Sequence, residues 1–199
     1  MSKKYLAEFV GTFALSFIVI AALAAGVSAP LVVPVIAALT LGLFVYTIGS
    51  VSGCHINPAV TLGLVSVKRI TPTEAVMYIV AQIFGAAMAI AAAKLFTLAL
   101  PTPAVGVFDI RLFMAEALGT AVFTFGIAAV VKEKVHASMS GVVVGGSLLL
   151  GVLFSSLAGA SGILNPAVAF ALNSVTLVYI LAPIVGSVAG FKLSYYLAK

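Results

Sequence analysis

"SGILNPAVAF" (Ser161–Phe170) contains an Asn-Pro pair, which normally marks a turn or a helix start near water. The chain around it is 63% hydrophobic and only 8% charged, with a mean hydropathy of +1.30. Soluble domains carry charge on about a quarter of their residues. The Asn-Pro pair therefore interrupts the backbone within a strongly apolar sequence.

Six apolar runs are each long enough to cross about 30 Å of hydrocarbon, which takes about 20 helical residues. They cover residues 5–26, 34–52, 75–98, 111–131, 137–158 and 177–197. Little chain remains outside them, so we predict an all-α membrane protein with one transmembrane domain over residues 1–199. The first run also resembles a signal peptide ending at Val27–Ala29, but Glu8 would interrupt its apolar region.

The basic residues follow the positive-inside pattern, in which cytoplasmic loops carry the excess of Lys and Arg. With the N-terminus in the cytoplasm, only Arg111 and Lys94 lie towards the outside. The cytoplasmic group is Lys3, Lys4, Lys68, Arg69, Lys132, Lys134 and Lys199, with Lys192 near it. We therefore expect a plasma- or inner-membrane protein with both termini cytoplasmic. Because the basic residues lie at the ends of the spans, the net charge of +5 supports a lipid bilayer and not nucleic acid as the partner.

The sequence repeats itself. "AEFVGTFALSFIVIA" (Ala7–Ala21) parallels "AEALGTAVFTFGIAA" (Ala115–Ala129), and "NPAV" at Asn57 recurs at Asn165, both 108 positions later. Because each copy holds three spans, the second copy enters the membrane from the opposite side. We predict inverted repeats over about residues 1–100 and 109–199, an architecture that places functional sites near the midplane on interrupted helices.

The offset between the copies then changes. Residues 78–89 resemble residues 179–190 at an offset of 101, so the second copy is seven residues shorter. We expect the loss in the linker that carries Lys68, Arg69 and Pro72 in the first copy.

Each Asn-Pro pair predicts the start of a short helix, because Asn is a good N-cap and Pro suits the first helical position. The helices would run through "NPAVTLGLVSV" from Asn57 and "NPAVAFALN" from Asn165. Each is about half a bilayer long. Two half-helices that enter from opposite faces would meet at the centre. The alternative is a pair of ordinary interhelical turns.

The Gly- and Ser-rich segments before these helices predict a pore. Non-helical backbone at membrane depth survives only where protein buries it or where it lines a water-filled cavity. The amides of Asn57 and Asn165 would offer donors at the centre. Acceptor carbonyls or vestibule groups would come from Gly53, Cys54, His55, Ser161 and Ile163. The pattern favours a passive conduit for small neutral molecules.

Two motifs and the opening of the chain resemble the aquaporins, of the major intrinsic protein family. They are "SGCHINPAVT" (Ser52–Thr61), "NPA" at Asn165–Ala167 and "AEFVGTF" near the N-terminus. The resemblance covers essentially the whole chain. It implies six transmembrane helices, two re-entrant half-helices, a pore in each subunit, a homotetramer, no cofactor and no enzymatic activity. The implied pore centre is Asn57, Pro58, Ala59, Asn165, Pro166 and Ala167. Glu8 and Glu116 correspond to glutamates that brace the re-entrant loops.

The second motif departs from the family pattern. Most relatives continue with Arg after this NPA, and here the residue is Val168. The other members of the family's outer constriction would be Ala37, Gly162 and about Leu153. All are uncharged and none is aromatic, so we expect a wider mouth that passes glycerol, urea, peroxide, metalloid hydroxides or ammonia besides water.

Three alternatives remain open. Phe44, Phe154 or a loop residue near Arg111 could refill the constriction and leave a strict water channel. Glu8 and Glu116 could relay protons in a coupled transporter. The pore could be closed in a mainly structural membrane protein.

The two histidines and the cysteine could act in the pore or could have only a structural role. His55 either lines the vestibule or holds the loop as a neutral imidazole. Cys54 is either a packed thiol or a mercury-sensitive pore residue. As the single cysteine it excludes an intramolecular disulfide, and we expect no metal site. His136 lies in a charged loop and is expected to be solvated.

Overall fold

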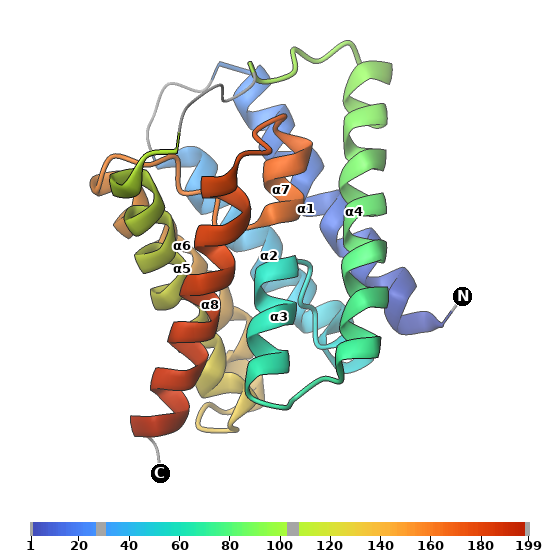
Figure 1. Cartoon of the computed structure of the whole chain (residues 1–199). Helices are drawn as coiled ribbons and strands as arrows, with labels where there is room; N and C mark the ends of the chain where they lie inside the picture. Colours follow the sequence, from blue (N-terminus) through green and yellow to red (C-terminus); the bar gives the residue numbers. More distant parts are fainter. Residues whose placement is uncertain (1, 27–30, 103–107, 198–199) are drawn as a thin grey trace.

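The computed structural model describes residues 2–26, 31–102 and 108–197. Within them the chain forms helices joined by short turns (Figure 1). The candidate cleavage site Val27–Ala29 and the terminal Lys199 lie outside these ranges. The helices are α1 (Lys3–Ala24), α2 (Val32–Ser52), α3 (Pro58–Ser66), α4 (Pro72–Leu95), α5 (Ile110–Val131), a short 3-10 turn (Ala137–Met139), α6 (Ser140–Leu157), α7 (Pro166–Ala171) and α8 (Leu177–Leu197).

Six of these helices are long and apolar enough to cross a membrane, as the sequence predicted. They are α1, α2, α4, α5, α6 together with its preceding turn, and α8. Large apolar side chains such as Leu39, Phe84 and Leu150 are exposed on their outer faces, where lipid would cover them.

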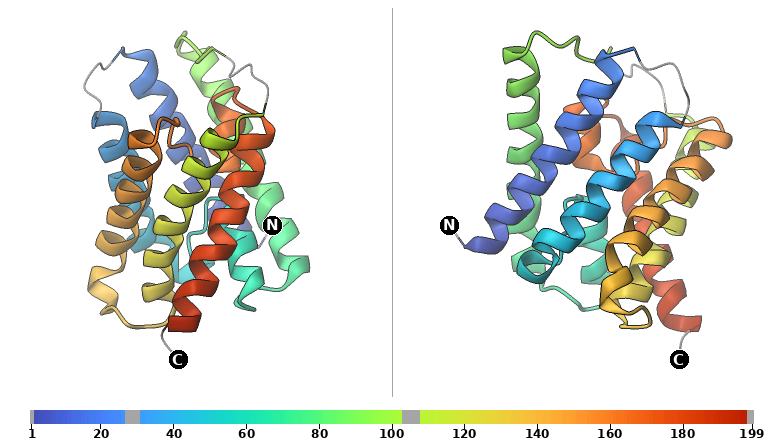
Figure 2. Two further views of the ribbon diagram at one scale, coloured as in Figure 1. Left: turned by 60° about the vertical axis from the view of Figure 1, so that its left-hand side comes forward. Right: turned by 180° about the vertical axis from the view of Figure 1, so that it is seen from behind.

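The two halves share one packing pattern, which confirms the inverted repeat. In the first half α1 packs against α2 and α4, and in the second half α5 packs against α6 and α8. The halves meet through α2 and α6, and each short helix packs on a long helix of the other half: α3 on α8, and α7 on α4. Figure 1 shows α7 above α3, and both views in Figure 2 show the long helices crossing obliquely around this centre.

Glycine allows the closest helix contacts inside each half. A Cβ on Gly85 of α4 would collide with the carbonyl oxygen of Phe9 in α1. A Cβ on Gly186 of α8 would likewise collide with the carbonyl oxygen of Ala117 in α5. These two glycines are equivalent in the repeat, and small residues at such crossings are how membrane helices approach each other.

The short helices begin at the predicted residues but end earlier than predicted. The side chain of Asn57 accepts a hydrogen bond from the Ala59 amide, and that of Asn165 accepts from the Ala167 amide, so both asparagines are N-caps. α3 has nine residues and α7 has only six. α7 ends early because Asn173 adopts a left-handed conformation (φ 55°), and the next amide, of Ser174, bonds back to the Ala169 carbonyl.

The seven-residue difference between the copies does not lie in the linker, contrary to the prediction. Residues 67–71 and residues 172–176 join the short helices to the next span, and both linkers have five residues. Because the linkers are equal, the shortening falls on α7 and on the first turn of α8.

Candidate functional site

Two tight turns precede the short helices and carry a backbone conformation that is rare for residues with side chains. Ile56 and Leu164, each directly before a capping asparagine, have positive φ angles of 38° and 53°. A β-branched residue such as Ile56 in this region is strained and persists only where its surroundings hold it. The following contacts provide that support.

Glu8 of α1 holds the first turn. Its carboxylate is completely buried and accepts hydrogen bonds from the amides of His55 (2.9 Å) and Ile56 (2.6 Å). It also accepts from the Ser52 hydroxyl (2.7 Å) and from Nε2 of Gln82 in α4 (2.8 Å). Four donors on two oxygens fix the carboxylate and, with it, the turn.

Glu116 of α5 does the same for the second turn, mostly through backbone groups. Its buried carboxylate accepts from the amides of Gly162 (2.7 Å), Ile163 (3.2 Å) and Leu164 (2.9 Å). The Ser155 hydroxyl adds a fourth hydrogen bond at 3.0 Å.

The two turns are joined at the centre of the bundle by a reciprocal pair of hydrogen bonds. Nδ2 of Asn57 donates to the Leu164 carbonyl, and Nδ2 of Asn165 donates to the Ile56 carbonyl, both at 3.0 Å. The left-handed backbone at Ile56 and Leu164 thus has its amide bound to a glutamate and its carbonyl bound to the opposite asparagine. Each amide nitrogen keeps one further N–H that these hydrogen bonds do not use.

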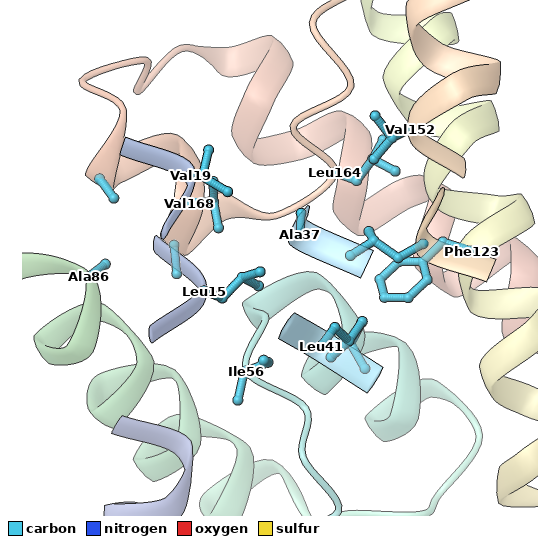
Figure 3. Close-up of a cluster of buried hydrophobic side chains, with 14 of the residues drawn as sticks. Leu15, Val19, Ala37, Leu41, Ile56, Ala86, Phe123, Val152, Leu164 and Val168 are labelled. Carbon is cyan, nitrogen blue, oxygen red and sulfur yellow. The ribbon is translucent and has the colours of Figure 1, made fainter. Parts of the chain in front are cut away.

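A cavity of about 450 Å³ opens above this contact in the orientation of Figure 1, and we call it the upper cavity. Both asparagines reach it, and its wall is otherwise mostly aliphatic; Figure 3 shows several of these side chains, among which Phe123 has the only ring of those labelled. The lining residues are Leu15, Val19, Leu23, Val33, Pro34, Ala37, Leu41, His55, Ile56, Asn57, Pro101, Phe123, Leu148, Val152, Ser156, Ser161, Gly162, Ile163, Asn165, Val168, Leu172 and Ser174.

A second cavity of about 350 Å³, the lower cavity, lies at the other end of the bundle. It is lined by Leu41, Val45, Ser52, Gly53, Cys54, His55, Val60, Leu64, Arg69, Ile70, Glu74, Tyr78, Phe123, Ile127, Val130, Val131 and Val144. Leu41, His55 and Phe123 line both cavities. The two cavities therefore adjoin at these three side chains, and they follow one another along the bundle on the path that the sequence predicts for a pore.

The structure brings most of the predicted site residues to this path. Gly53 and Cys54 line the lower cavity, Ser161 and Ile163 line the upper cavity, and His55 lines both. The Pro and Ala residues of the two motifs are buried in the first turns of α3 and α7, behind the asparagines. They are Pro58, Ala59, Pro166 and Ala167.

At the expected outer constriction the register of α6 differs from the prediction. Ala37, Gly162 and Val168 line the upper cavity. On α6 the lining residues are Leu148, Val152 and Ser156, spaced by four on one helical face, and the predicted Leu153 is not among the described residues that line it. The position taken for Leu153 belongs to Val152.

Sequence reasoning missed the polar groups that hold His55. Nδ1 of His55 lies 3.1 Å from the Thr61 hydroxyl, which donates to the Asn57 carbonyl and accepts from Gln82. Since the single hydroxyl proton of Thr61 goes to that carbonyl, Nδ1 of His55 is the donor in their contact. Thr61 lies four residues after Asn57 on the same face of α3, which is the only trace of this role in the sequence.

Two inverted three-span halves, meeting at capped half-helices between two adjoining cavities, are the architecture of a membrane channel. The sequence profile of the family described as Major intrinsic protein matches residues 1–195, and the chain belongs to that family. Proteins of this family are channels and not enzymes. The chain is accordingly an integral membrane protein that passively conducts water, small solutes or both.

Relatives of two kinds match almost the whole chain. It is 30% identical to Aquaporin AqpM of Methanothermobacter marburgensis, covering 100% of this chain and 98% of that protein. It is 36% identical to the Glycerol uptake facilitator protein-like 6 of Lactiplantibacillus plantarum, covering 94% of each. The crystal structure of the aquaglyceroporin from Plasmodium falciparum superimposes with a TM-score of 0.77 at 21% identity, covering 98% of this chain and 95% of that one. That likeness supports the fold.

Proposed function

We propose that the channel has a wide, uncharged upper mouth and passes small neutral solutes such as glycerol and urea as well as water. One observation carries the proposal. Val168, where most relatives have Arg, faces the 450 Å³ upper cavity together with Ala37, Val152 and Gly162. Of the described residues that line this cavity, none is charged. A mouth without a guanidinium lacks its five N–H donors and its bulk.

Among the described residues, the side chains expected to refill the constriction lie elsewhere, except that Pro101 of the loop before α5 lines the upper cavity. Phe44 is not among the described residues that line either cavity, and Phe154 is 58% exposed on the outer face of α6. Arg111 is exposed in the first turn of α5 and does not line the upper cavity. The volume next to Val168 therefore supports passage of a solute larger than water.

The asparagine pair supplies the polar step within this apolar path. A hydroxyl or carbonyl oxygen of a solute accepts from the free N–H of Asn57 or Asn165. The C–H groups of glycerol then contact the aliphatic wall, and the flat face of the small, neutral urea molecule does so in its place. A cation would meet only N–H donors at this step and would lose its hydration.

A proton-coupled transporter, the second candidate, fits the geometry less well. The carboxylates of Glu8 and Glu116 each accept four hydrogen bonds from the turns and their neighbours, and neither is among the described residues that line a cavity. These hydrogen bonds support a structural role for both carboxylates, which is to hold the two turns.

We also propose that the lower end faces the cytoplasm. Lys3, Lys4, Lys68, Arg69, Lys132 and Lys134 lie at the ends of helices on that side, and only Lys94 and Arg111 lie at the other. A homotetramer is supported by an exposed apolar groove between α2 and α6. Leu39, Val142 and Gly146 are exposed along this groove, and a Cβ on Gly146 would meet nothing within 4 Å, so another subunit's helix would fit there. Cross-linking in membranes tests the assembly.

Solute flux into liposomes tests the proposed selectivity. Purified protein should speed the entry of water, glycerol and urea over empty liposomes, and sucrose should stay outside. Val168→Arg should reduce glycerol flux about tenfold and water flux much less, because it restores bulk and a fixed charge. Val168→Leu is the matched control for bulk without charge. Glycerol entry no faster than in empty liposomes, with water flux present, would make the protein a strict water channel. Absence of every flux would indicate a closed structural protein.

A further inference from the structure

The charges on the path are distributed unequally between its two ends. Among the described residues, the upper cavity has no charged lining side chain, whereas Arg69 and Glu74 line the lower one. Glu74 forms an ion pair with Lys4, so its negative charge is already balanced. Arg69 makes no ion pair with any described carboxylate and leaves the lower mouth with an excess positive charge.

The Arg69 guanidinium is held in place by the far end of the chain. Its Nε donates to the Tyr195 hydroxyl of α8 at 2.7 Å, and its central carbon lies 5.8 Å from the centre of the same ring. These contacts join the turn after α3, in the first half, to the last span of the second half. A hydrogen bond and the face of an aromatic ring restrict a side chain that would otherwise move freely in solvent.

A second cation reinforces the positive potential. Nζ of Lys132, at the end of α5, lies 5.0 Å from the centre of the Tyr195 ring and donates to the Ser194 carbonyl at 3.0 Å. One tyrosine ring thus gathers an arginine and a lysine at the lower mouth. The two positive charges repel each other, and their attraction to the aromatic ring offsets part of this repulsion.

The backbone also directs Arg69 towards the cavity. Lys68 has a φ of 59°, and this left-handed turn lets the Arg69 amide bond back to the Leu64 carbonyl of α3 at 2.9 Å. Arg69 and Lys68 are both exposed, but of the two only Arg69 lines the lower cavity. The neighbouring lysine is therefore a natural control with the same charge.

We propose that Arg69, positioned by Tyr195, determines charge selectivity by repelling small cations at the lower mouth. The fixed cation that the upper mouth lacks at Val168 is supplied at the opposite end of the path. This inference rests on the proposed channel function. It adds that exclusion of cations does not depend on the asparagine pair alone.

The experiment compares two probes of nearly the same size and shape, neutral urea and the guanidinium cation, by their entry into liposomes. Arg69→Gln should raise guanidinium entry about tenfold, the order expected for one charge about 10 Å away at a protein–water boundary. Urea entry should change less than twofold. Arg69→Lys should keep guanidinium out, and Lys68→Gln should behave like the unaltered protein.

Tyr195→Phe tests the positioning role. It keeps the ring and removes the hydroxyl, so guanidinium entry should rise by about threefold while urea entry stays constant. Raising the salt concentration to 1 M, where the screening length is about 3 Å, should shrink the difference between Arg69→Gln and the unaltered protein. A change in packing alone would alter both probes together and would not respond to salt in this way.

The outcomes separate the two proposals. If guanidinium entry relative to urea is the same in Arg69→Gln and in the unaltered protein, the role of Arg69 is wrong while the channel stands. If urea is excluded and water passes, the wide upper mouth is wrong, and guanidinium entry relative to water flux decides the role of Arg69. If nothing passes, the proposed function fails first.

Discussion

The two halves of the molecule build the same strained turn with different supports. In the first half Glu8 is part of a side-chain network that includes Gln82, Thr61 and His55. The equivalents of these three residues in the second half are Pro183, Ala169 and Ile163, none of which has a polar side chain. There Glu116 relies on three backbone amides and one serine. Both halves hold the turn with a buried carboxylate, whereas the polar groups around that carboxylate differ between the halves.

The two halves therefore place different side chains at equivalent points of the path. The network of the first half ends at His55, which lines both cavities, so this half provides polar groups to the middle of the path. The second half also contributes Asn165 and Ser161, but at the position equivalent to His55 it places the aliphatic Ile163. Substitutions at equivalent positions test whether the halves are as different as their contacts indicate.

Replacing the two glutamates should have unequal effects. Glu116→Gln leaves backbone amides facing an NH₂ group, and we expect a loss of about 3 kcal/mol in stability with nearly complete loss of water flux. Glu8→Gln should cost less, because Oε1 of Gln82 is buried without a partner and can accept from the new amide. Thermal unfolding in detergent and water flux per folded protein measure both.

Glu133→Gln, at an exposed position, is the control for a change of charge alone. Equal losses from Glu8→Gln and Glu116→Gln would mean that the network around Gln82 gives no extra tolerance.

Gly85 and Gly186 occupy equivalent helix contacts, so replacing either one should have the same effect on stability. Gly85→Ala and Gly186→Ala each place a methyl group against a backbone carbonyl of the neighbouring helix. We expect similar destabilisation of about 2 kcal/mol, since the helices must separate to admit it. Gly49→Ala, whose added carbon meets only a Val45 methyl at 3.9 Å and lies outside the cavities and the α2–α6 groove, should leave the unfolding temperature unchanged. A strong effect in one half only would show that the repeat is not packed symmetrically.

Much of the fold follows from local chemistry that the sequence displays. Asn57 and Asn165 act through their own side chains on the next few amides, so an Asn-Pro pair in an apolar chain is sufficient to predict the N-cap. The register of α6 could not be predicted in this way. Val152 and not Leu153 lines the cavity because packing against α2 and α5 sets the rotation of that helix.

Contacts between distant segments also left no pattern in the sequence. Arg69 and Tyr195 lie 126 positions apart, and each would be expected in an ordinary solvent-exposed turn or helix end. The early end of α7 was readable in principle, since Asn ranks after Gly at left-handed helix ends, and Asn173 occupies that position.

The mildest change makes the first half resemble the second. Thr61→Ala copies the residue at the equivalent position, Ala169, and removes the hydroxyl that holds His55 and Gln82. We expect about 1 kcal/mol of destabilisation and a change in water flux of about twofold, because the His55 ring loses its fixed orientation. Ala169→Thr adds a hydroxyl without those partners and should give no gain. If Thr61→Ala left flux and stability unaltered, the network would have no measurable function.

The exchange of hydrogen bonds between Asn57 and Asn165 has a consequence for how the protein is made. The acceptor of Asn57 is the Leu164 carbonyl, which is synthesised 107 residues later. A nascent chain that has inserted only its first three spans therefore lacks the atom to which α3 is tied. The bond between the two turns must wait for the second half to enter the bilayer. A fragment ending after α4 should therefore leave the turn before α3 more open to protease and, at Cys54, to a water-soluble thiol label until the missing half is supplied.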